Sequence, residues 1–157
     1  MGALLLDAGP LVAHILCGLR PDLAGQHRRV AAYSVDMVER LCRVIDDADR
    51  HISLPNVLTE ASNHLGRGEQ EAAPGAAAAL ARYISSLDEI FQQSADVIRY
   101  REYAALGLSD TAIFSLSARL KRQRVKVVTQ DWQLYNRLNS EGVDCLNVFH
   151  WRTPSRG

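Results

Sequence analysis

The sequence predicts an α/β protein with a parallel β-sheet that helices cover on both faces. Short apolar runs alternate along the whole chain with segments in which apolar residues recur every third or fourth position. The first of these runs, Ala3–Leu6, is uniformly apolar and does not alternate polar with apolar residues. Such runs indicate strands buried on both faces, and strands that alternate with helices are typical of parallel sheets.

The first strand is expected at Ala3–Leu6, and it ends on Asp7. Gly9 and Pro10 follow, and then a helical apolar pattern from Leu11 to about Leu16. Gly9 allows a turn that a larger residue would resist, and Pro10 suits the first turn of a helix, where its missing N–H costs nothing. We therefore expect a buried strand, an acid at its carboxyl end and a helix directly after it.

The remaining elements follow from the same patterns. Strands are expected at 51–54, 90–93, 125–129 and 145–148, and helices at 30–49, 57–65, 76–87, 94–106, 110–123 and 132–140. Asn56, Ser94, Ser109 and Asp131 are expected to cap four of these helices. Residues 1–150 are expected to form a single domain, and residues 151–157 a mobile tail.

Composition and charge limit the classes of function. Of the 157 residues, 47% are hydrophobic and 23% charged, which is typical of a globular domain. The 18 basic and 18 acidic residues cancel, so any claim of nucleic-acid binding must rest on a local patch. Three widely spaced cysteines without a C-x-x-C motif, and the absence of a signal peptide or a membrane-length apolar run, indicate a cytoplasmic protein with reduced thiols and no membrane contact.

Four acidic residues stand where strands and helices meet. Asp7 ends the first strand, and Glu60 lies inside the helix after the second. Asp110 opens an otherwise apolar helix, and Asp131 follows the strand at 125–129. Because ligands of open α/β sheets bind at the carboxyl ends of the strands, we expect the other three acids to converge on Asp7.

Each of these positions also has a purely structural explanation. Asp110 and Asp131 could stabilise helix N-termini, an effect of about 0.3–1 kcal/mol, and Glu60 could be a surface residue of an amphipathic helix. Asp7 is harder to explain in this way, because a carboxylate that directly follows a buried strand needs a partner. The shared placement of the four acids favours a common site.

A divalent cation would resolve the repulsion within such a site. Two like charges about 4 Å apart repel by roughly 4 kcal/mol at an effective dielectric constant near 20. Oxygen ligands suit Mg²⁺ or Mn²⁺, and a water held by Mg²⁺ could attack a phosphodiester. Zinc is not indicated, since the five histidines show no paired spacing.

In four stretches the sequence resembles the PIN-domain family of metal-dependent ribonucleases, and in particular its VapC-type toxins. The stretches occur in the order of the family and are 5–13, 57–65, 108–112 and 127–131. The resemblance implies a five-stranded parallel sheet in the order 3-2-1-4-5, with one or two Mg²⁺ or Mn²⁺ ions at its carboxyl edge.

The resemblance also implies roles for individual residues. Asp7, Glu60, Asp110 and Asp131 would hold the metal and carry the catalysis, and the position of Asp131 is the one that varies most within the family. Thr129 would be the hydroxyl neighbour of the fourth acid, and Asn63 a polar support near Glu60. Ala8 departs from the family, in which Thr or Ser is common at this position and can hydrogen-bond within the site; its loss removes no ligand.

The expected substrate is RNA. His27–Arg29 and Arg99–Arg101 could contact phosphates or bases, whereas the basic residues between Arg119 and Lys126 are more simply explained as cations at a helix C-terminus. Many proteins of this type are toxins that form homodimers and pair with an antitoxin, so the resemblance implies a homodimer and a possible cognate antitoxin.

Two other functions fit parts of the sequence. A catalytically silent PIN fold could bind RNA or a protein partner without cutting. A phosphotransfer fold of the dehalogenase or response-regulator kind also places Asp after a strand. In this chain, however, Gly9 stands where the second aspartate of that motif is expected, and Lys126 lies within its strand rather than beyond it.

Overall fold

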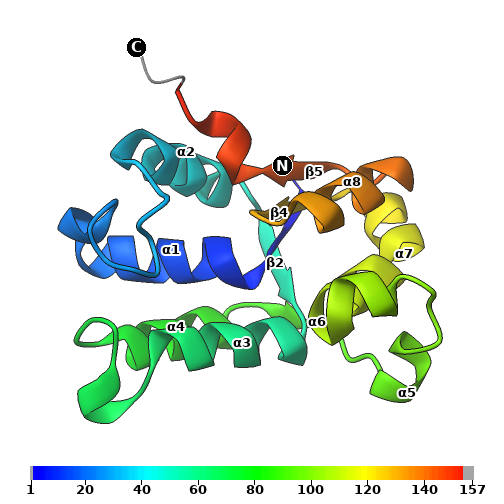
Figure 1. Ribbon diagram of the computed structural model, residues 1–157, viewed down its shortest axis with the longest axis horizontal. Helices are drawn as coiled ribbons and strands as arrows, with labels where there is room; N and C mark the ends of the chain where they lie inside the picture. The colour runs from blue at the N-terminus through cyan, green and yellow to red at the C-terminus, as the bar shows by residue number, and fades with distance from the viewer. Residues whose placement is uncertain (1, 154–157) are drawn as a thin grey trace.

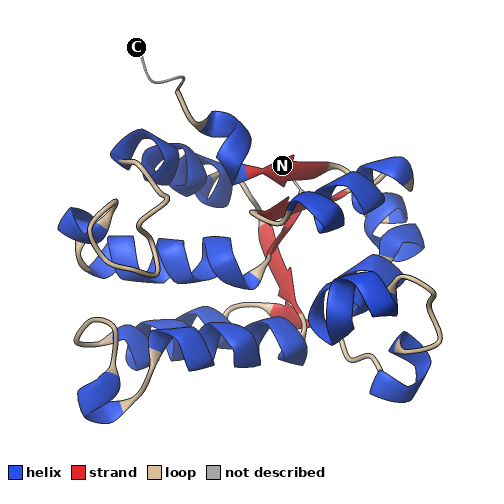
Figure 2. Cartoon of the chain, in the orientation of Figure 1, coloured by secondary structure: helices blue, strands red, loops and turns tan. Residues whose placement is uncertain are grey.

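The computed structural model describes residues 2–153. At its centre is a five-stranded sheet in which every neighbouring pair is parallel, in the order β3-β2-β1-β4-β5. The strands are β1 (Ala3–Leu6), β2 (Arg50–Ser53), β3 (Asp88–Glu89), β4 (Val125–Thr129) and β5 (Cys145–Asn147). Helices flank the sheet on both sides (Figures 1 and 2), so the predicted three-layer α/β/α sandwich and its strand order are confirmed.

The helices form two groups that pack against separate apolar clusters. The first cluster joins α1 (Ala8–Leu19), α2 (Val35–Asp46), α3 (Pro55–Leu65) and α4 (Ala76–Ser85). The second joins α5 (Ser94–Val97), α6 (Tyr103–Ser115), α7 (Ser117–Arg122) and α8 (Trp132–Ser140). Three short 3₁₀ turns complete the fold, namely η1 (Pro21–Leu23), η2 (Gly68–Gln70) and η3 (Val148–Trp151). None of the helices within residues 2–153 is both long and apolar enough to cross a bilayer.

The central strand β1 belongs to both clusters. Leu4 and Leu6 pack in the first, and Ala3 and Leu5 in the second, because successive side chains of a strand point to opposite faces. Burial of each leucine stabilises the fold by roughly 1.5–3 kcal/mol. The carboxyl end of β1, and with it Asp7, is therefore fixed at the middle of the molecule.

The predicted starts of α2 and α3 are wrong. Ser34 caps α2, since its hydroxyl accepts a hydrogen bond from the Met37 N–H at 3.2 Å, so this helix begins at Val35 rather than at residue 30. In α3, Pro55 is the first helical residue and Leu54 stands at the cap position that was assigned to Asn56. The proline ring fixes the helical φ angle and supplies the start that a capping side chain would otherwise mark.

The region between β3 and β4 also differs from expectation. The third strand is Asp88–Glu89 rather than 90–93, and α5 ends at Val97 rather than continuing to residue 106. The predicted break at Gly107 is present, because this residue has a φ of 76° inside α6, but the Ser109 hydroxyl caps nothing within the described part of the chain. The helix expected at 110–123 divides at Leu116 into α6 and α7.

The predicted tail begins inside ordered structure. Trp151 ends η3, and the Arg40 guanidinium lies 4.8 Å from the centroid of its indole ring. Residues 154–157 of the predicted tail lie outside the described residues.

Candidate functional site

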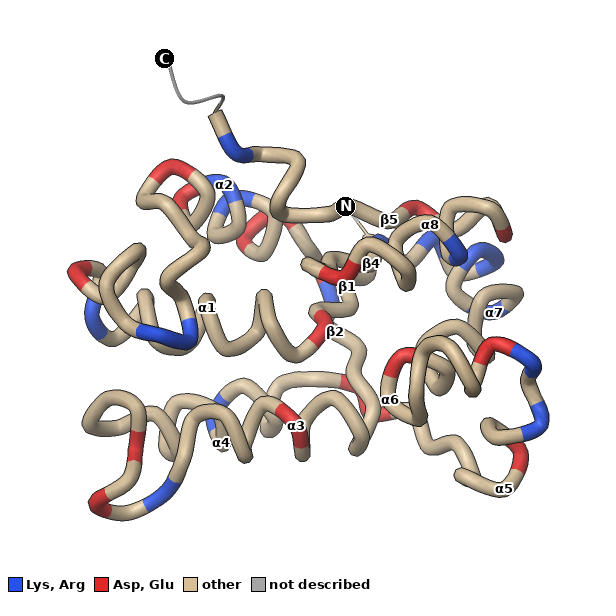
Figure 3. The backbone as a smooth tube through the Cα atoms, in the orientation of Figure 1, with Lys and Arg blue, Asp and Glu red and all other residues tan. Residues whose placement is uncertain are grey.

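The four predicted acids line a single cleft of about 290 Å³, which is called the acid cleft below. They are Asp7, Glu60, Asp110 and Asp131, and the cleft is completed by Gly9, Val12, Arg29, His64 and Gln130. Figure 3 shows acidic positions on α3 and α6 and beside β1 and β4, the elements that carry the four residues. The structure therefore brings all four together, as the sequence predicted, while their roles as metal ligands and catalytic groups stay predictions.

Asp7 is held at the end of β1 by two hydrogen bonds to its carboxylate. The Ala8 N–H donates to Oδ1 at 2.8 Å, and the Thr129 hydroxyl donates to Oδ2 at 2.7 Å. The backbone N–H of Asp7 donates to the Val128 carbonyl at 2.9 Å, which extends the pairing of β1 with β4 by one residue. The side chain is only 6% exposed, so these contacts fix its orientation.

Thr129 links Asp7 to Asp131. Its hydroxyl oxygen accepts a hydrogen bond from the Asp131 N–H at 3.0 Å while it donates to Asp7. Asp131 in turn caps α8, because its Oδ1 accepts from the Leu134 N–H at 2.7 Å. The sequence assigned Asp131 both a helix-start role and a site role. In the structure it caps α8 and also lines the acid cleft.

Asp110 and Glu60 reach the cleft from opposite layers. Asp110 lies in the first turn of α6 after Gly107, and within residues 2–153 its carboxyl has no hydrogen-bond or ion-pair partner. Glu60 lies on α3, where its Oε1 is 3.7 Å from His64 Nε2 one turn later. The cleft therefore has carboxyl groups on both sides of the carboxyl end of β1.

Burial and the charges of neighbouring carboxylates raise the pKa values of Asp110 and Asp7. Burial raises the pKa of Asp110 to about 8, and the charges of Asp7, Asp131 and Glu60 add to this rise. Burial also raises the pKa of Asp7 to about 6, despite the hydrogen bonds from Thr129 and Ala8, with contributions from Glu60 and Asp131. Asp7 and Asp110 therefore retain protons at a pH at which ordinary carboxyls are ionised.

The donor set fits a hard divalent cation. As the side chains stand, no group of three or more His, Cys, Asp or Glu residues within residues 2–153 is gathered tightly enough to constitute a metal site. Nevertheless the acid cleft offers four carboxyl groups, two of them with raised pKa values. Oxygen ligands of this kind suit Mg²⁺ or Mn²⁺, and a dication would relieve the repulsion that the pKa values express.

Gln130 is a cleft residue that the sequence did not reveal. Its Oε1 accepts a hydrogen bond from the Tyr33 hydroxyl at 2.8 Å, and its side chain lies against Gly9. The predicted turn at Gly9 is wrong, since this residue belongs to α1. Glycine leaves space there for the end of the Gln130 side chain, which a Cβ atom would displace. Tyr33 and Gln130 are 97 residues apart in sequence, and no local pattern predicts their contact.

Asn63 does not lie where the resemblance implied. It is exposed and lines a neighbouring cleft with Arg67 and Arg28, outside the acid cleft. A helix turns by about 100° per residue, so the side chain of residue 63 projects in a different direction from that of residue 60. Within the acid cleft, His64 rather than Asn63 is the polar neighbour of Glu60.

Comparison with known proteins supports the fold but identifies no family. The chain matches no family model and no curated protein. Among solved structures it is similar to the crystal structure of PAE2754 from Pyrobaculum aerophilum, with a TM-score of 0.50 and 18% sequence identity over 96% of this chain and 92% of the other. At this identity the likeness concerns the fold alone.

Proposed function

We propose that this protein is a Mg²⁺- or Mn²⁺-dependent endoribonuclease of the PIN type, with Asp7, Glu60, Asp110 and Asp131 around the cation. The observation that carries the proposal is the acid cleft, where four carboxyls from different elements meet at the carboxyl edge of the sheet, and where burial and the neighbouring charges raise the pKa values of Asp7 and Asp110. A protein tolerates such a cluster at a cost in stability, and perturbed carboxyls in a cleft are typical of functional sites.

The residues of the cleft divide the work of hydrolysis. Thr129 and the Ala8 N–H fix the Asp7 carboxylate, so that little reorganisation is needed when a cation binds. When bound, Mg²⁺ or Mn²⁺ would neutralise negative charge on the phosphate and lower the pKa of water. Arg29 lines the same cleft and offers a guanidinium to the phosphodiester oxygens. Water adds to phosphorus, one P–O bond breaks, and no covalent bond to the protein is needed.

A phosphotransfer function is less well supported. That chemistry needs a lysine near the acid that follows the first strand. Lys126 instead lines a separate cavity with Gly2 and Asp144, and its Nζ lies 3.8 Å from Asp144 Oδ2. The arrangement around Asp7 therefore favours an acid cluster that binds a cation.

The remaining features of the proposal rest on the resemblance to VapC-type toxins. They are a cytoplasmic location, a homodimer and a cognate antitoxin that restrains the nuclease. Size-exclusion chromatography with light scattering measures the oligomeric state directly, and a homodimer is the expected result.

Cleavage of a labelled RNA tests the proposal. Wild-type protein is expected to cut with Mn²⁺, to stop with EDTA and to recover when Mn²⁺ is restored. Asp7→Asn is expected to lose at least about 10²-fold in rate, more than is typical for a residue that only supports a ligand. Asp144→Asn is the matched control, because it removes an exposed carboxylate far from the cleft.

Equal rates for wild type and Asp7→Asn, with or without Mn²⁺, would contradict the proposal. RNA that binds but is never cut, by a protein that also fails to bind Mn²⁺, would identify the catalytically silent module instead. Thermal unfolding of each variant separates these results from misfolding.

A further inference from the structure

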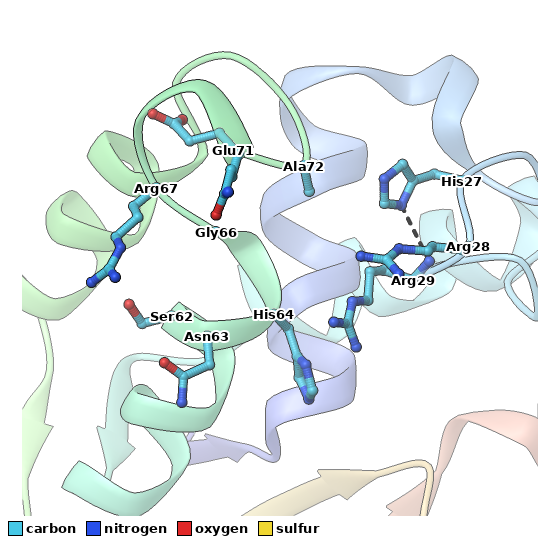
Figure 4. Close-up of a pocket in the computed structure, with 11 residues that line it drawn as sticks. His27, Arg28, Arg29, Ser62, Asn63, His64, Gly66, Arg67, Glu71 and Ala72 are labelled. Atoms are coloured by element: carbon cyan, nitrogen blue, oxygen red, sulfur yellow. Dashed lines mark hydrogen bonds between the residues drawn. The ribbon is translucent and has the colours of Figure 1, made fainter.

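A second cleft adjoins the acid cleft and is rich in arginine. It has a volume of about 660 Å³ and is called the arginine cleft below. His27, Arg28 and Arg29 of the segment after η1 form one wall. Asn63 and His64 of α3, together with Arg67 just beyond it, form the other (Figure 4).

The two clefts adjoin. Arg29 and His64 line both of them, so the arginines lie next to the four acids. Figure 4 shows the Arg29 and His64 side chains pointing in the same direction, away from the Glu71 end of the arginine cleft. A chain molecule bound across the acid cleft can therefore extend into the arginine cleft.

The arginines of this cleft carry positive charge that the protein leaves unneutralised. Within residues 2–153, the guanidinium groups of Arg28, Arg29 and Arg67 take part in no ion pair or hydrogen bond. Glu71 is the acidic residue of the lining, and its carboxylate accepts from the Ala77 N–H at 3.4 Å. Figure 4 shows this carboxylate turned away from Arg28 and Arg29. The cleft therefore presents a cationic surface in a protein whose net charge is zero.

We infer that the arginine cleft binds the phosphodiester backbone of the RNA strand on one side of the bond that is cut, an inference that rests on the proposed nuclease function. Guanidinium groups match phosphate oxygens in geometry and charge. An acidic peptide could satisfy the arginines, but its carboxylates would meet the carboxyls of the adjoining acid cleft. A phosphodiester chain can occupy both clefts, with its phosphates in the arginine cleft and the bond that is cut in the acid cleft.

Binding of a short, labelled single-stranded RNA tests the inference. The measurement uses fluorescence anisotropy in an Asp7→Asn background, which keeps the RNA intact. Arg28→Ala/Arg67→Ala is expected to weaken binding by at least about tenfold at low salt, since a hydrogen bond to a charged group contributes about 1.5–3 kcal/mol. The slope of log K against log salt is expected to become shallower by about 1.4, because each phosphate contact contributes about 0.7 for a single strand.

Arg119→Ala/Arg122→Ala is the matched control. It removes the same charge from the last turn of α7, which lies outside both clefts, and it is expected to retain the parent's affinity and salt slope. A DNA strand of the same sequence is expected to show the same change of slope, because phosphate contacts do not read the sugar. A change of slope seen with only one of the two strands, or an Arg28→Ala/Arg67→Ala variant that matches the control, would overturn the inference.

RNA-cleavage kinetics of variants that retain Asp7 separates this inference from the proposed function. If RNA is cut and Arg28→Ala/Arg67→Ala lowers kcat/KM mainly through KM, both stand. If RNA is cut and this variant matches the control, the inference alone fails. If RNA is not cut but binding still depends on Arg28 and Arg67, the nuclease function alone fails. Both arginines are exposed and unpaired, so the variant is expected to keep the parent's Tm.

Discussion

The acid cleft and the arginine cleft are neighbours that the fold builds in opposite ways. Asp7 and Asp131 follow strands β1 and β4, and Glu60 and Asp110 stand on helices packed in the two apolar clusters. Arg28 and Arg67 lie instead on exposed segments that connect helices. The packed core holds like charges together against their repulsion, whereas the loops present cations that no residue in the described part of the chain neutralises.

This difference assigns different tasks to the two clefts. A site that must keep a fixed geometry benefits from rigid elements, and a surface that only has to attract a flexible chain does not. Changes in the acid cleft should therefore alter kcat, metal binding and the pH dependence of stability. Changes in the arginine cleft should alter KM and salt dependence.

The largest expected effect among these tests concerns Thr129. Thr129→Val keeps the shape of the side chain but removes the hydroxyl that donates to Asp7 and accepts from the Asp131 N–H. We expect kcat to fall by about 10–100-fold, as for other groups that orient a metal ligand. Because this hydrogen bond lowers the pKa of Asp7, its loss should also shift the acid limb of the pH–rate profile to higher pH.

Thr129→Ser is the matched control for this substitution. It retains the hydroxyl, and it is expected to keep the pH profile and most of the rate. A Thr129→Val variant with an unshifted profile would show that Thr129 only fills space in the core.

A smaller effect is expected on stability at Asp110. Its pKa lies near 8 in the folded protein, against 3.8 for the ordinary side chain, so the folded state holds this proton to a higher pH than the unfolded chain does. Without metal, the free energy of unfolding should therefore fall as the pH rises from about 4 to about 8. Asp110→Asn removes this loss and should exceed wild type at pH 8.5 by at least about 1 kcal/mol, or roughly 2–4 °C in Tm.

Thermal unfolding in EDTA at pH 4 and pH 8.5 measures the difference. Asp144→Asn serves as the control, since this exposed residue is not part of the cluster. A stability of Asp110→Asn that parallels wild type across this range would mean that burial and the neighbouring carboxyls do not raise the pKa of Asp110 in the folded protein.

The smallest effect is expected at Tyr33, a buried residue whose hydroxyl contacts Gln130 of the acid cleft. Tyr33→Phe removes the hydroxyl that donates to Gln130 but preserves the edge-to-face contact with Phe149, whose ring centroid is 5.9 Å away. A loss of about 0.5–1.5 kcal/mol in the free energy of unfolding is expected from chemical denaturation. Phe149→Leu, which removes the ring contact and retains the hydrogen bond, provides the comparison. If Tyr33→Phe leaves the free energy of unfolding unchanged, the position of Gln130 does not depend on this hydrogen bond.

The sequence predicted the acid cleft because strands have a direction. Asp7 and Asp131 follow two apolar runs, and parallel pairing brings the carboxyl ends of those runs to one edge of the sheet. Asp110 was predictable from the break at Gly107, which restarts the helix just before it. The strand order was predicted from the resemblance, because the apolar patterns of the chain do not show which strands are neighbours in the sheet.

The parts that the sequence missed depend on contacts between distant segments. Gly9 leaves space for the end of the Gln130 side chain, to which Tyr33 donates a hydrogen bond from a third segment. Strand β3 carries Asp88 and Glu89, both exposed at the sheet edge, so it has no apolar pattern by which to recognise it. The sequence indicated His27–Arg29 as possible phosphate contacts, but it could not place Arg67 opposite them, because the arginine cleft forms between a loop and a helix end that only the tertiary fold brings together.

Calorimetric titration of the protein with Mn²⁺ at pH 7, repeated in two buffers of different ionisation enthalpy, tests most directly whether the four acids form one cation site. We expect binding with net release of protons, because Asp110, with a pKa near 8, must lose its proton to become a ligand. Asp110→Asn should bind Mn²⁺ more weakly and without most of this release, and Asp7→Asn should bind more weakly still. Absence of Mn²⁺ binding by the wild type, or binding that neither substitution weakens, would contradict a cation site in the acid cleft.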